Sequence, residues 1–127
     1  MSKFIKATES SRLVLSDGDW IEVKNRLGYG EEQRLAGSGI TNIRSVEDSE
    51  TPEMGFDLEK FSVDRIFIWG ITWSFKDDSD KLVKFNREAI RALDPDVAVE
   101  INALLDTHIE KMADLKVTTI GSNPTKV

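Results

Sequence analysis

The stretch that decides the fold is SRLVLSDGDWIEVK, residues 11–24. Asp17 and Gly18 lie between two runs that are rich in apolar and β-branched residues. An Asp-Gly pair in that setting is typical of a tight hairpin turn, whose two central residues both need a positive φ. The sequence therefore predicts a β-hairpin over residues 11–24.

One side of this hairpin is apolar. Neighbouring side chains of a strand point to opposite faces. Four apolar residues therefore share one side: Leu13 and Leu15 on the first strand, Ile21 and Val23 on the second. We expect that side to be buried, and Trp20 to lie on the opposite side, where an exposed indole is costly unless it contacts a partner.

The next predicted element is a helix near residues 29–43. Acidic residues occupy its first turn, where the helix dipole favours negative charge. Gly37 and Gly39 weaken its second half, because each Gly destabilises a helix by about 1 kcal/mol relative to Ala. Whether the helix ends or bends there stays open.

Residues 45–57 are acidic and interrupted by Pro and Gly, which predicts a mobile surface loop. This loop is the best candidate for a disordered segment.

Residues 58–75 fit two patterns. Aromatic and β-branched residues alternate at 67, 69, 71, 73 and 75, as they do in a strand. Apolar residues between 58 and 71 also recur at helical spacing, and the run is long for one strand. We expect a buried helix over residues 58–73, in which Gly70 permits close contact with another helix, while the strand stays an open alternative.

Two helices with strong start signals follow. Asn86 is a favourable N-cap for a helix over residues 87–93. Asp94 is a favourable cap for a second helix over residues 95–115, and Pro95 occupies the first helical position, where its missing N–H is harmless. Apolar residues recur along this last helix in steps of three and four, giving one apolar stripe.

These elements predict an α+β fold, mainly helical, with an N-terminal β-hairpin followed by a small helical bundle of about four helices. A chain of 127 residues supports one hydrophobic core. We expect a single globular domain over residues 1–115. Residues 116–127 have no apolar period and several helix breakers, which predicts a flexible C-terminal tail.

Composition excludes several classes of function. The chain has no cysteine, which leaves neither a disulfide framework nor a thiolate metal site. The net charge of −6 opposes nucleic-acid binding, which needs clustered Lys and Arg. The longest apolar run, residues 66–73, is less than half of the roughly 20 residues that span a bilayer. We expect a cytoplasmic protein that binds neither nucleic acid nor membrane.

No pattern of residues predicts an active site. His108 is the single histidine and lies on the apolar stripe of the last helix, which favours a packed, structural role. Asp77, Asp78 and Asp80 lack the spacing and the distal Glu of a calcium loop, so a solvated acidic turn is favoured. The sequence predicts no enzyme, no cofactor and no metal.

Several segments, taken in order, resemble the tail assembly chaperones of phages with long, non-contractile tails. The segments that carry the resemblance are 17–24 (DGDWIEVK), 27–31 (LGYGE), 73–75 (WSF), 86–90 (NREAI) and 93–95 (LDP), closing near His108. Together they cover residues 11 to about 110. The chain departs from the family pattern at Gly28, where Thr or Ser is usual, and at Ser79-Asp80, where a Gly is usual.

This resemblance implies a function in assembly. Members of the family bind the tape measure protein before the tail tube forms around it, and help to recruit tail tube subunits. It also implies self-association, absence from the mature virion, location in the host cell cytoplasm, and helical structure over residues 58–73.

Three aromatic residues are candidates for contact with a partner. Trp20 is the first, because the hairpin pattern places it away from the apolar side, and Tyr29 is the second. Trp73 is the third, although packing in a core is the more frequent use of such a residue.

Functions of other kinds stay open as alternatives to a chaperone. The main one is a structural minor tail or connector subunit of a phage virion. The others are a metal-dependent hydrolase that uses His108 and the acidic turn, and an acidic inhibitor that mimics nucleic acid.

Overall fold

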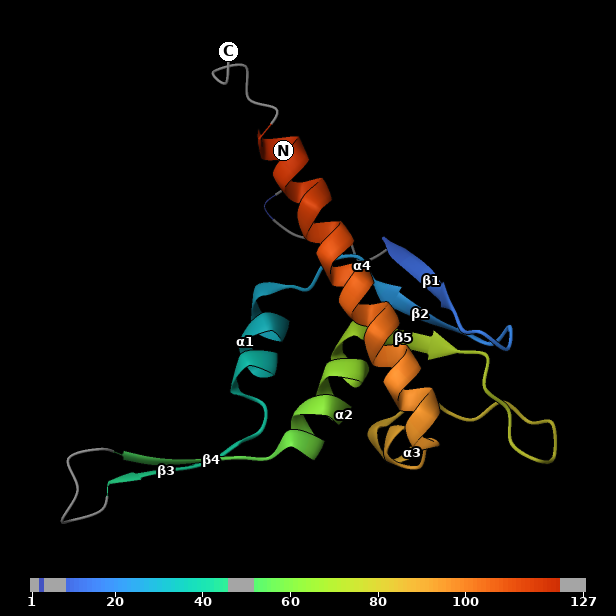
Figure 1. Ribbon diagram of the computed structural model, residues 1–127, viewed down its shortest axis with the longest axis horizontal. Coiled ribbons are helices and arrows are strands. Elements are labelled where there is room, and N and C mark those ends of the chain that lie inside the picture. Colours follow the sequence, from blue (N-terminus) through green and yellow to red (C-terminus); the bar gives the residue numbers. More distant parts are fainter. Residues whose placement is uncertain (1–2, 4–8, 46–51, 122–127) are drawn as a thin grey trace.

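The computed structural model of the protein describes residue 3 and residues 9–45 and 52–121. The predicted α+β, mainly helical fold with an N-terminal hairpin and four helices is confirmed (Figure 1). The elements are, in order, β1 (Ser10–Val14), β2 (Trp20–Lys24), α1 (Tyr29–Gly37), β3 (Ile40–Ser45), β4 (Pro52–Phe56), α2 (Leu58–Trp69), β5 (Gly70–Trp73), α3 (Arg87–Arg91) and α4 (Pro95–Gly121).

The predicted hairpin is confirmed, but its turn is of another kind. Strands β1 and β2 pair in antiparallel register, with Leu13 opposite Ile21. The N–H of Leu15 donates to the carbonyl of Asp19 at 2.7 Å, and that of Gly18 donates to the carbonyl of Leu15 at 3.0 Å. Of the two central residues only Gly18 has a positive φ, +95°. The expectation of two positive φ values was wrong, because a three-residue loop needs a single left-handed residue, at its last position.

A third strand completes the N-terminal sheet, which has the order β1-β2-β5. Strand β5 pairs antiparallel with β2 and places Trp73 opposite Ile21. The buried residues of the sheet join those of α2, α3 and α4 in one core. The core consists of Leu15, Ile21, Val23, Leu27, Val63, Ile66, Ile68, Trp69, Trp73, Ile90, Ile101 and Leu105.

The boundary between α2 and β5 corrects the expected helix over residues 58–73. Helix α2 ends at Trp69, and the chain continues as β5 because β2 offers an unpaired edge. A Cβ atom on Gly70 would lie 2.3 Å from Cζ of Phe85 and 2.7 Å from the carbonyl oxygen of Ile66. Gly70 therefore permits a close approach, as expected, but that of an aromatic ring from a loop and not that of another helix.

The expected helix over residues 29–43 is also shorter. Helix α1 ends at Gly37, and Ser38 is extended, with ψ 139°. The hydroxyl of Ser38 donates to Asp64 at 2.6 Å, which holds the chain out of helical geometry. Residues that sequence assigned to the second half of this helix form β3 instead.

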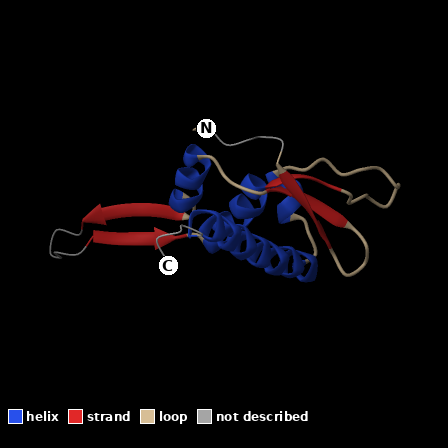
Figure 2. Cartoon of the chain, turned by 90° about the horizontal axis from the view of Figure 1, so that it is seen from above, coloured by secondary structure: helices blue, strands red, loops and turns tan. Residues whose placement is uncertain are grey.

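A second, two-stranded sheet replaces part of the expected loop over residues 45–57. Strand β4 pairs antiparallel with β3, and Ile40 lies opposite Phe56. In both Figure 1 and Figure 2 this hairpin projects from the rest of the molecule. The loop prediction was wrong for Pro52–Phe56, and residues 46–51 lie outside the described residues. The aromatic rings of Phe56 and Phe61, 5.7 Å apart, join the base of the projection to α2.

Both predicted helix starts in the C-terminal part are confirmed. The side chain of Asn86 accepts a hydrogen bond from the N–H of Ala89 at 2.7 Å, and that of Asp94 accepts one from the N–H of Asp96 at 2.8 Å. Helix α4 continues to Gly121, so residues 116–121 are helical where the sequence indicated no regular structure. No Pro or Gly interrupts the chain between Pro95 and Gly121, and β-branched residues only lower helix propensity slightly. Residues 122–127 lie outside the described residues.

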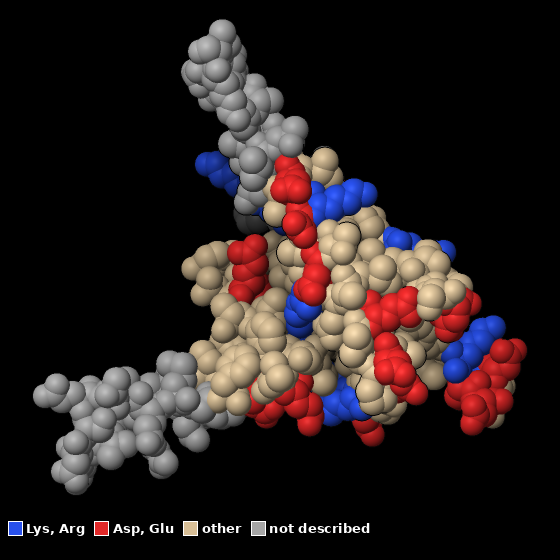
Figure 3. All heavy atoms as spheres, in the orientation of Figure 1, with Lys and Arg blue, Asp and Glu red and all other residues tan. Residues whose placement is uncertain are grey.

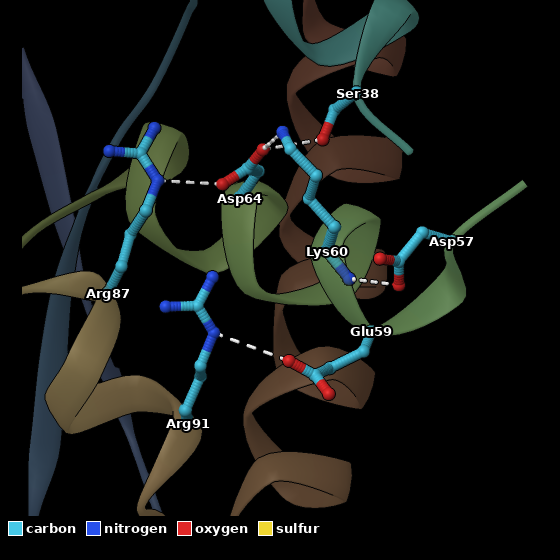
Figure 4. A network of polar contacts seen from close by, with 7 residues as sticks. All are labelled: Ser38, Asp57, Glu59, Lys60, Asp64, Arg87 and Arg91. Carbon is cyan, nitrogen blue, oxygen red and sulfur yellow. Dashed lines mark hydrogen bonds and ion pairs between the residues drawn. The ribbon is translucent and has the colours of Figure 1, made fainter. Parts of the chain in front are cut away.

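Asp64 joins three helical segments (Figure 4). Its carboxylate accepts from Ser38 at the end of α1, from Lys60 one turn earlier in α2 at 2.8 Å, and from Nε of Arg87 in α3 at 2.7 Å. Burial by itself raises the pKa of Asp64, but the hydrogen bonds from Lys60, Ser38 and Arg87 outweigh it and hold this pKa far below its ordinary value. The carboxylate is therefore charged at neutral pH and fixes α1 and α3 on α2.

Candidate partner-binding surface

A groove of about 480 Å³ lies beside the C-terminal half of α4. It is lined by residues from four parts of the chain: Glu9; Asn25, Arg26, Leu27 and Glu32; Trp69; and Ile109, Met112, Ala113 and Leu115. We call it the α4 groove. Most of its lining side chains are apolar, which suits the binding of an apolar partner segment.

The groove continues the apolar stripe of α4 past the end of the core. Along this stripe Ile101 and Leu105 are each 1% exposed and His108 is 4% exposed, whereas Ile109 and Met112 are only half-buried. Figure 1 shows α4 running on beyond the sheet. The turns of α4 that hold Ile109 and Met112 therefore carry apolar side chains that the sheet does not fully cover.

The wall of the groove opposite α4 is held in place by hydrogen bonds. Nε2 of His108 lies 3.0 Å from the carbonyl oxygen of Lys24, which fastens the end of β2 to α4. The Lys24 ammonium pairs with Glu31, and Glu31 also accepts from the N–H of Gly28 at 3.0 Å. The loop over residues 25–28 is thus fixed at both ends, so this wall of the groove is formed before any partner arrives.

The arrangement around Glu31 also explains how α1 begins without the usual Thr or Ser. Gly28 is the N-cap and has no side chain to accept from the helix, but the Glu31 carboxylate returns to its N–H. Burial raises the pKa of Glu31, while the hydrogen bonds from Lys24 and Gly28 outweigh it, so the pKa is lowered overall. Glu31 stays charged and caps the helix.

The charge at the rim of the groove is mainly acidic. Glu9 and Glu32 line it together with one cation, Arg26, and neither carboxylate pairs with a cation of another described residue. On α4, Glu110 and Asp114 lie one turn apart. Figure 3 shows acidic side chains over both α1 and α4 on the face that it presents. A positively charged partner is therefore favoured here.

Tyr29 stands beside this groove, on an element that forms its wall. It is the first residue of α1 and is 79% exposed, three residues before Glu32. A large aromatic side chain exposed to this degree is typical of a protein contact. Its contact with a partner stays a prediction.

Trp20 faces away from the core, as the hairpin pattern indicated, but it is half-buried. The guanidinium of Arg12 lies over its ring, 3.6 Å from the centroid, and Arg12 also lies 3.7 Å from the Glu22 carboxylate. The chain itself covers part of the indole. Trp20 is therefore a weaker candidate for partner contact than Tyr29.

Trp73 is a core residue, which corrects its selection as a contact candidate. It is 2% exposed, and its indole N–H donates to the carbonyl of Val83 at 2.7 Å. Its ring stacks on Phe75 at 4.7 Å and meets the edge of Phe85 at 4.9 Å. A partner could not reach Trp73 without opening the core.

The remaining candidates from the sequence serve the structure. His108 is buried against Trp69, with ring centroids 6.3 Å apart, so the prediction of a packed histidine is confirmed. Asp77 accepts from the N–H groups of Ser79 and Lys81, which stabilises the polar turn. Across the described ranges, no group of three potential ligands is placed to hold a metal ion. Within the same ranges, no helix combines the length and the apolar character needed to cross a membrane.

Sequence reasoning missed the groove itself. Leu27, Trp69, Met112 and Ala113 were not selected, although the apolar stripe of the last helix was recognised. Helix length is the signal that could have found them: α4 has 27 residues, about 40 Å, against about 30 Å for the diameter of a small domain. A helix that long has to extend past the core.

No protein-family model matches this chain, and searches of curated proteins and of solved structures find no similar protein.

Proposed function

We propose that this chain is a phage tail assembly chaperone that binds the tape measure protein and helps to recruit tail tube subunits. It acts without catalysis, in the cytoplasm of the host, and does not stay in the mature virion. The resemblance in the order and spacing of its sequence segments is the basis of this proposal.

The observation that supports it most is the α4 groove with Tyr29 beside it. A chaperone for a long, aggregation-prone client needs an apolar surface that is open in the unbound state. The half-buried Met112 and the exposed Tyr29 provide such a surface. The net charge of −6 keeps a complex with an apolar client in solution.

The residues that carry the resemblance also position this surface. The segment 17–24 forms the turn and β2, whose last residue is tied to His108. The segment 27–31 supplies the floor residue Leu27, the N-cap Gly28 and the exposed Tyr29. Asn86 and Asp94 fix the starts of α3 and α4. Two of the segments that carry the resemblance, 17–24 and 27–31, therefore help to form the α4 groove or to hold it in place.

Co-expression tests the function. The chain is produced together with the protein encoded by the long open reading frame downstream of its gene, and the soluble fraction is assayed for that protein. We expect the downstream protein to become soluble and to co-purify. If it stays insoluble and this chain elutes alone, the chaperone proposal fails for this form of the protein.

Purified particles separate the chaperone from a structural minor tail or connector subunit. A chaperone is absent from them, whereas a virion subunit is present at constant stoichiometry. Quantitative mass spectrometry of particles purified by density gradient gives the answer.

A further inference from the structure

We infer that the α4 groove binds an amphipathic helix whose apolar stripe is flanked by Lys or Arg. This inference rests on the proposed function for the identity of the natural partner, which is a segment of the client. The chemistry of the site can be tested without that partner.

The apolar part of the argument comes from the floor and the helical wall. Leu27 is 4% exposed and Trp69 is 8% exposed, so both present a small apolar surface at the bottom of the groove. Ile109, Met112 and Ala113 stand above them in steps of three and four. Closer to the core, the same stripe packs on the sheet through Ile101 and Leu105. A second helix lying along α4 continues that packing for about two more turns.

The charged part of the argument comes from the rim. Glu9 and Glu32 face the groove, and Arg26 is the one cation among the described residues that line it. Glu110 and Asp114 line another hollow of α4, with Lys111, which shares only Leu115 with the groove. Among the described residues that line the groove, two carboxylates thus stand against one cation. A partner with Lys or Arg beside its apolar stripe gains favourable pairing, whereas an acidic partner is repelled.

Two synthetic peptides provide the probe. Both have about 18 residues, five helical turns, with Leu at helical spacing on one face. One carries Lys on its other faces and the second carries Glu. Binding of the fluorescein-labelled peptides to the full chain is measured by anisotropy. We expect the Lys peptide to bind at least about tenfold more tightly than the Glu peptide, with an affinity that falls as salt is added.

A substitution that fills the groove shows where the peptide binds. Ala113 is exposed and lines the groove, so Ala113→Trp occupies the space without removing a contact of the core. Ala103→Trp is the matched control, because Ala103 is also an exposed alanine of α4 but does not line the groove. We expect Ala113→Trp to weaken binding of the Lys peptide about tenfold and Ala103→Trp to leave it unchanged. Equal binding to both variants overturns the assignment of the groove.

Charge reversal tests the rim. Glu32→Lys places a cation on the groove, and Glu88→Lys makes the same change in the first turn of α3, away from it. Glu32→Lys should weaken the Lys peptide severalfold and improve the Glu peptide, whereas Glu88→Lys should do neither. If the two variants respond alike, the basic character of the partner is disproved.

The same variants separate this inference from the proposed function. If the wild-type chain solubilises the downstream protein and Ala113→Trp does so equally well, the function stands and the groove assignment fails. If the peptides respond to Ala113→Trp as expected but the downstream protein is not solubilised, the groove assignment stands and the chaperone proposal fails. Thermal unfolding of each variant identifies any that do not fold, and Met112→Gln, which removes an apolar contact without changing the charge, then serves as a second groove substitution.

Discussion

The carboxylate of Asp64 in α2 accepts a hydrogen bond from Nε of Arg87 in α3 at 2.7 Å, over a separation of 23 residues. The Asp64 side chain is 6% exposed, whereas that of Arg87 is 46% exposed and also lies over the ring of Phe67. The pair thus connects a buried side chain in the middle of α2 to a half-exposed side chain of α3. Because Ser38 and Lys60 share the same carboxylate, one side chain holds three segments.

Removal of the Asp64 carboxylate should destabilise the protein strongly. Asp64→Ala leaves the hydroxyl of Ser38 and two cations without their acceptor, which we expect to lower the free energy of unfolding by about 2 kcal/mol. Urea denaturation followed by circular dichroism measures the change. Glu59→Ala is the control, because Glu59 forms an exposed ion pair with Arg91, and such pairs contribute about 0.5 kcal/mol. Equal losses in the two variants would contradict the central role of Asp64.

The same carboxylate should make stability depend on acid pH. The pKa of Asp64 in the folded chain lies below its ordinary value of 3.8, so the folded state favours the charged form. This contribution is complete above the pKa of the unfolded chain and is lost as the pH falls through and below about 4. Urea midpoints measured from about pH 6 to pH 2.5 should therefore show the difference between wild type and Asp64→Asn shrinking in acid. A constant difference would show that the charge of Asp64 does not contribute.

Gly70 and Gly37 should respond in opposite ways to the same substitution. In Gly70→Ala the new methyl group meets the ring of Phe85 and the backbone oxygen of Ile66, so we expect a loss of at least about 2 kcal/mol. In Gly37→Ala nothing lies within 4 Å of the new Cβ, and the higher helix propensity of Ala should stabilise α1 by a few tenths of a kcal/mol. Thermal unfolding of the two variants measures both effects. A harmless Gly70→Ala would mean that the Phe85 ring can move aside.

Trp20 and Arg12 should be coupled energetically. Trp20→Ala removes a half-buried ring and should reduce stability by about 1 kcal/mol. Arg12→Ala should have a smaller effect, and the double variant should lose less than the sum of the two, with a coupling of about 0.5 kcal/mol from the cation–π contact. A double-mutant cycle in urea measures this coupling. Additive losses would show that the stacked geometry contributes nothing.

Tyr29 should matter for binding and not for folding. Tyr29→Ala removes a side chain that is 79% exposed, so we expect a change in stability below about 0.5 kcal/mol. Recovery of the downstream protein in co-expression should fall. Leu82→Ala is the control, because Leu82 is an apolar residue that is 61% exposed and lies between β5 and α3. Unchanged recovery with Tyr29→Ala would remove this residue from the partner-binding surface.

Local signals in the sequence account for the parts of the fold that were predicted. The apolar and β-branched runs on both sides of the Asp17-Gly18 turn specified the β1–β2 hairpin. The caps at Asn86 and Asp94 specified where α3 and α4 begin. Each depends on interactions between residues a few positions apart, which a sequence pattern records directly.

The predictions from sequence were wrong where contacts with residues far along the chain determine the secondary structure or the burial of a residue. Residues 70–73 fit a helix or a strand equally well by pattern, and the free edge of β2, about 50 residues earlier, selects the strand. Ser38 leaves helical geometry and bonds to Asp64 in α2. The role of Trp73 was open for the same reason: a pattern shows that an aromatic residue is present, but not whether other segments cover it.

The sequence alone determined the α+β class, the first hairpin, the helix starts and the structural role of His108, because these follow from turn geometry, capping and apolar period. Only the tertiary structure decided that β5 joins the sheet, that Trp73 is buried while Tyr29 is exposed, and that the apolar stripe of α4 extends past the core. The physical reason is that burial is a property of the whole packed chain: whether an apolar side chain stabilises the core or stays available to a partner depends on which distant segments reach it.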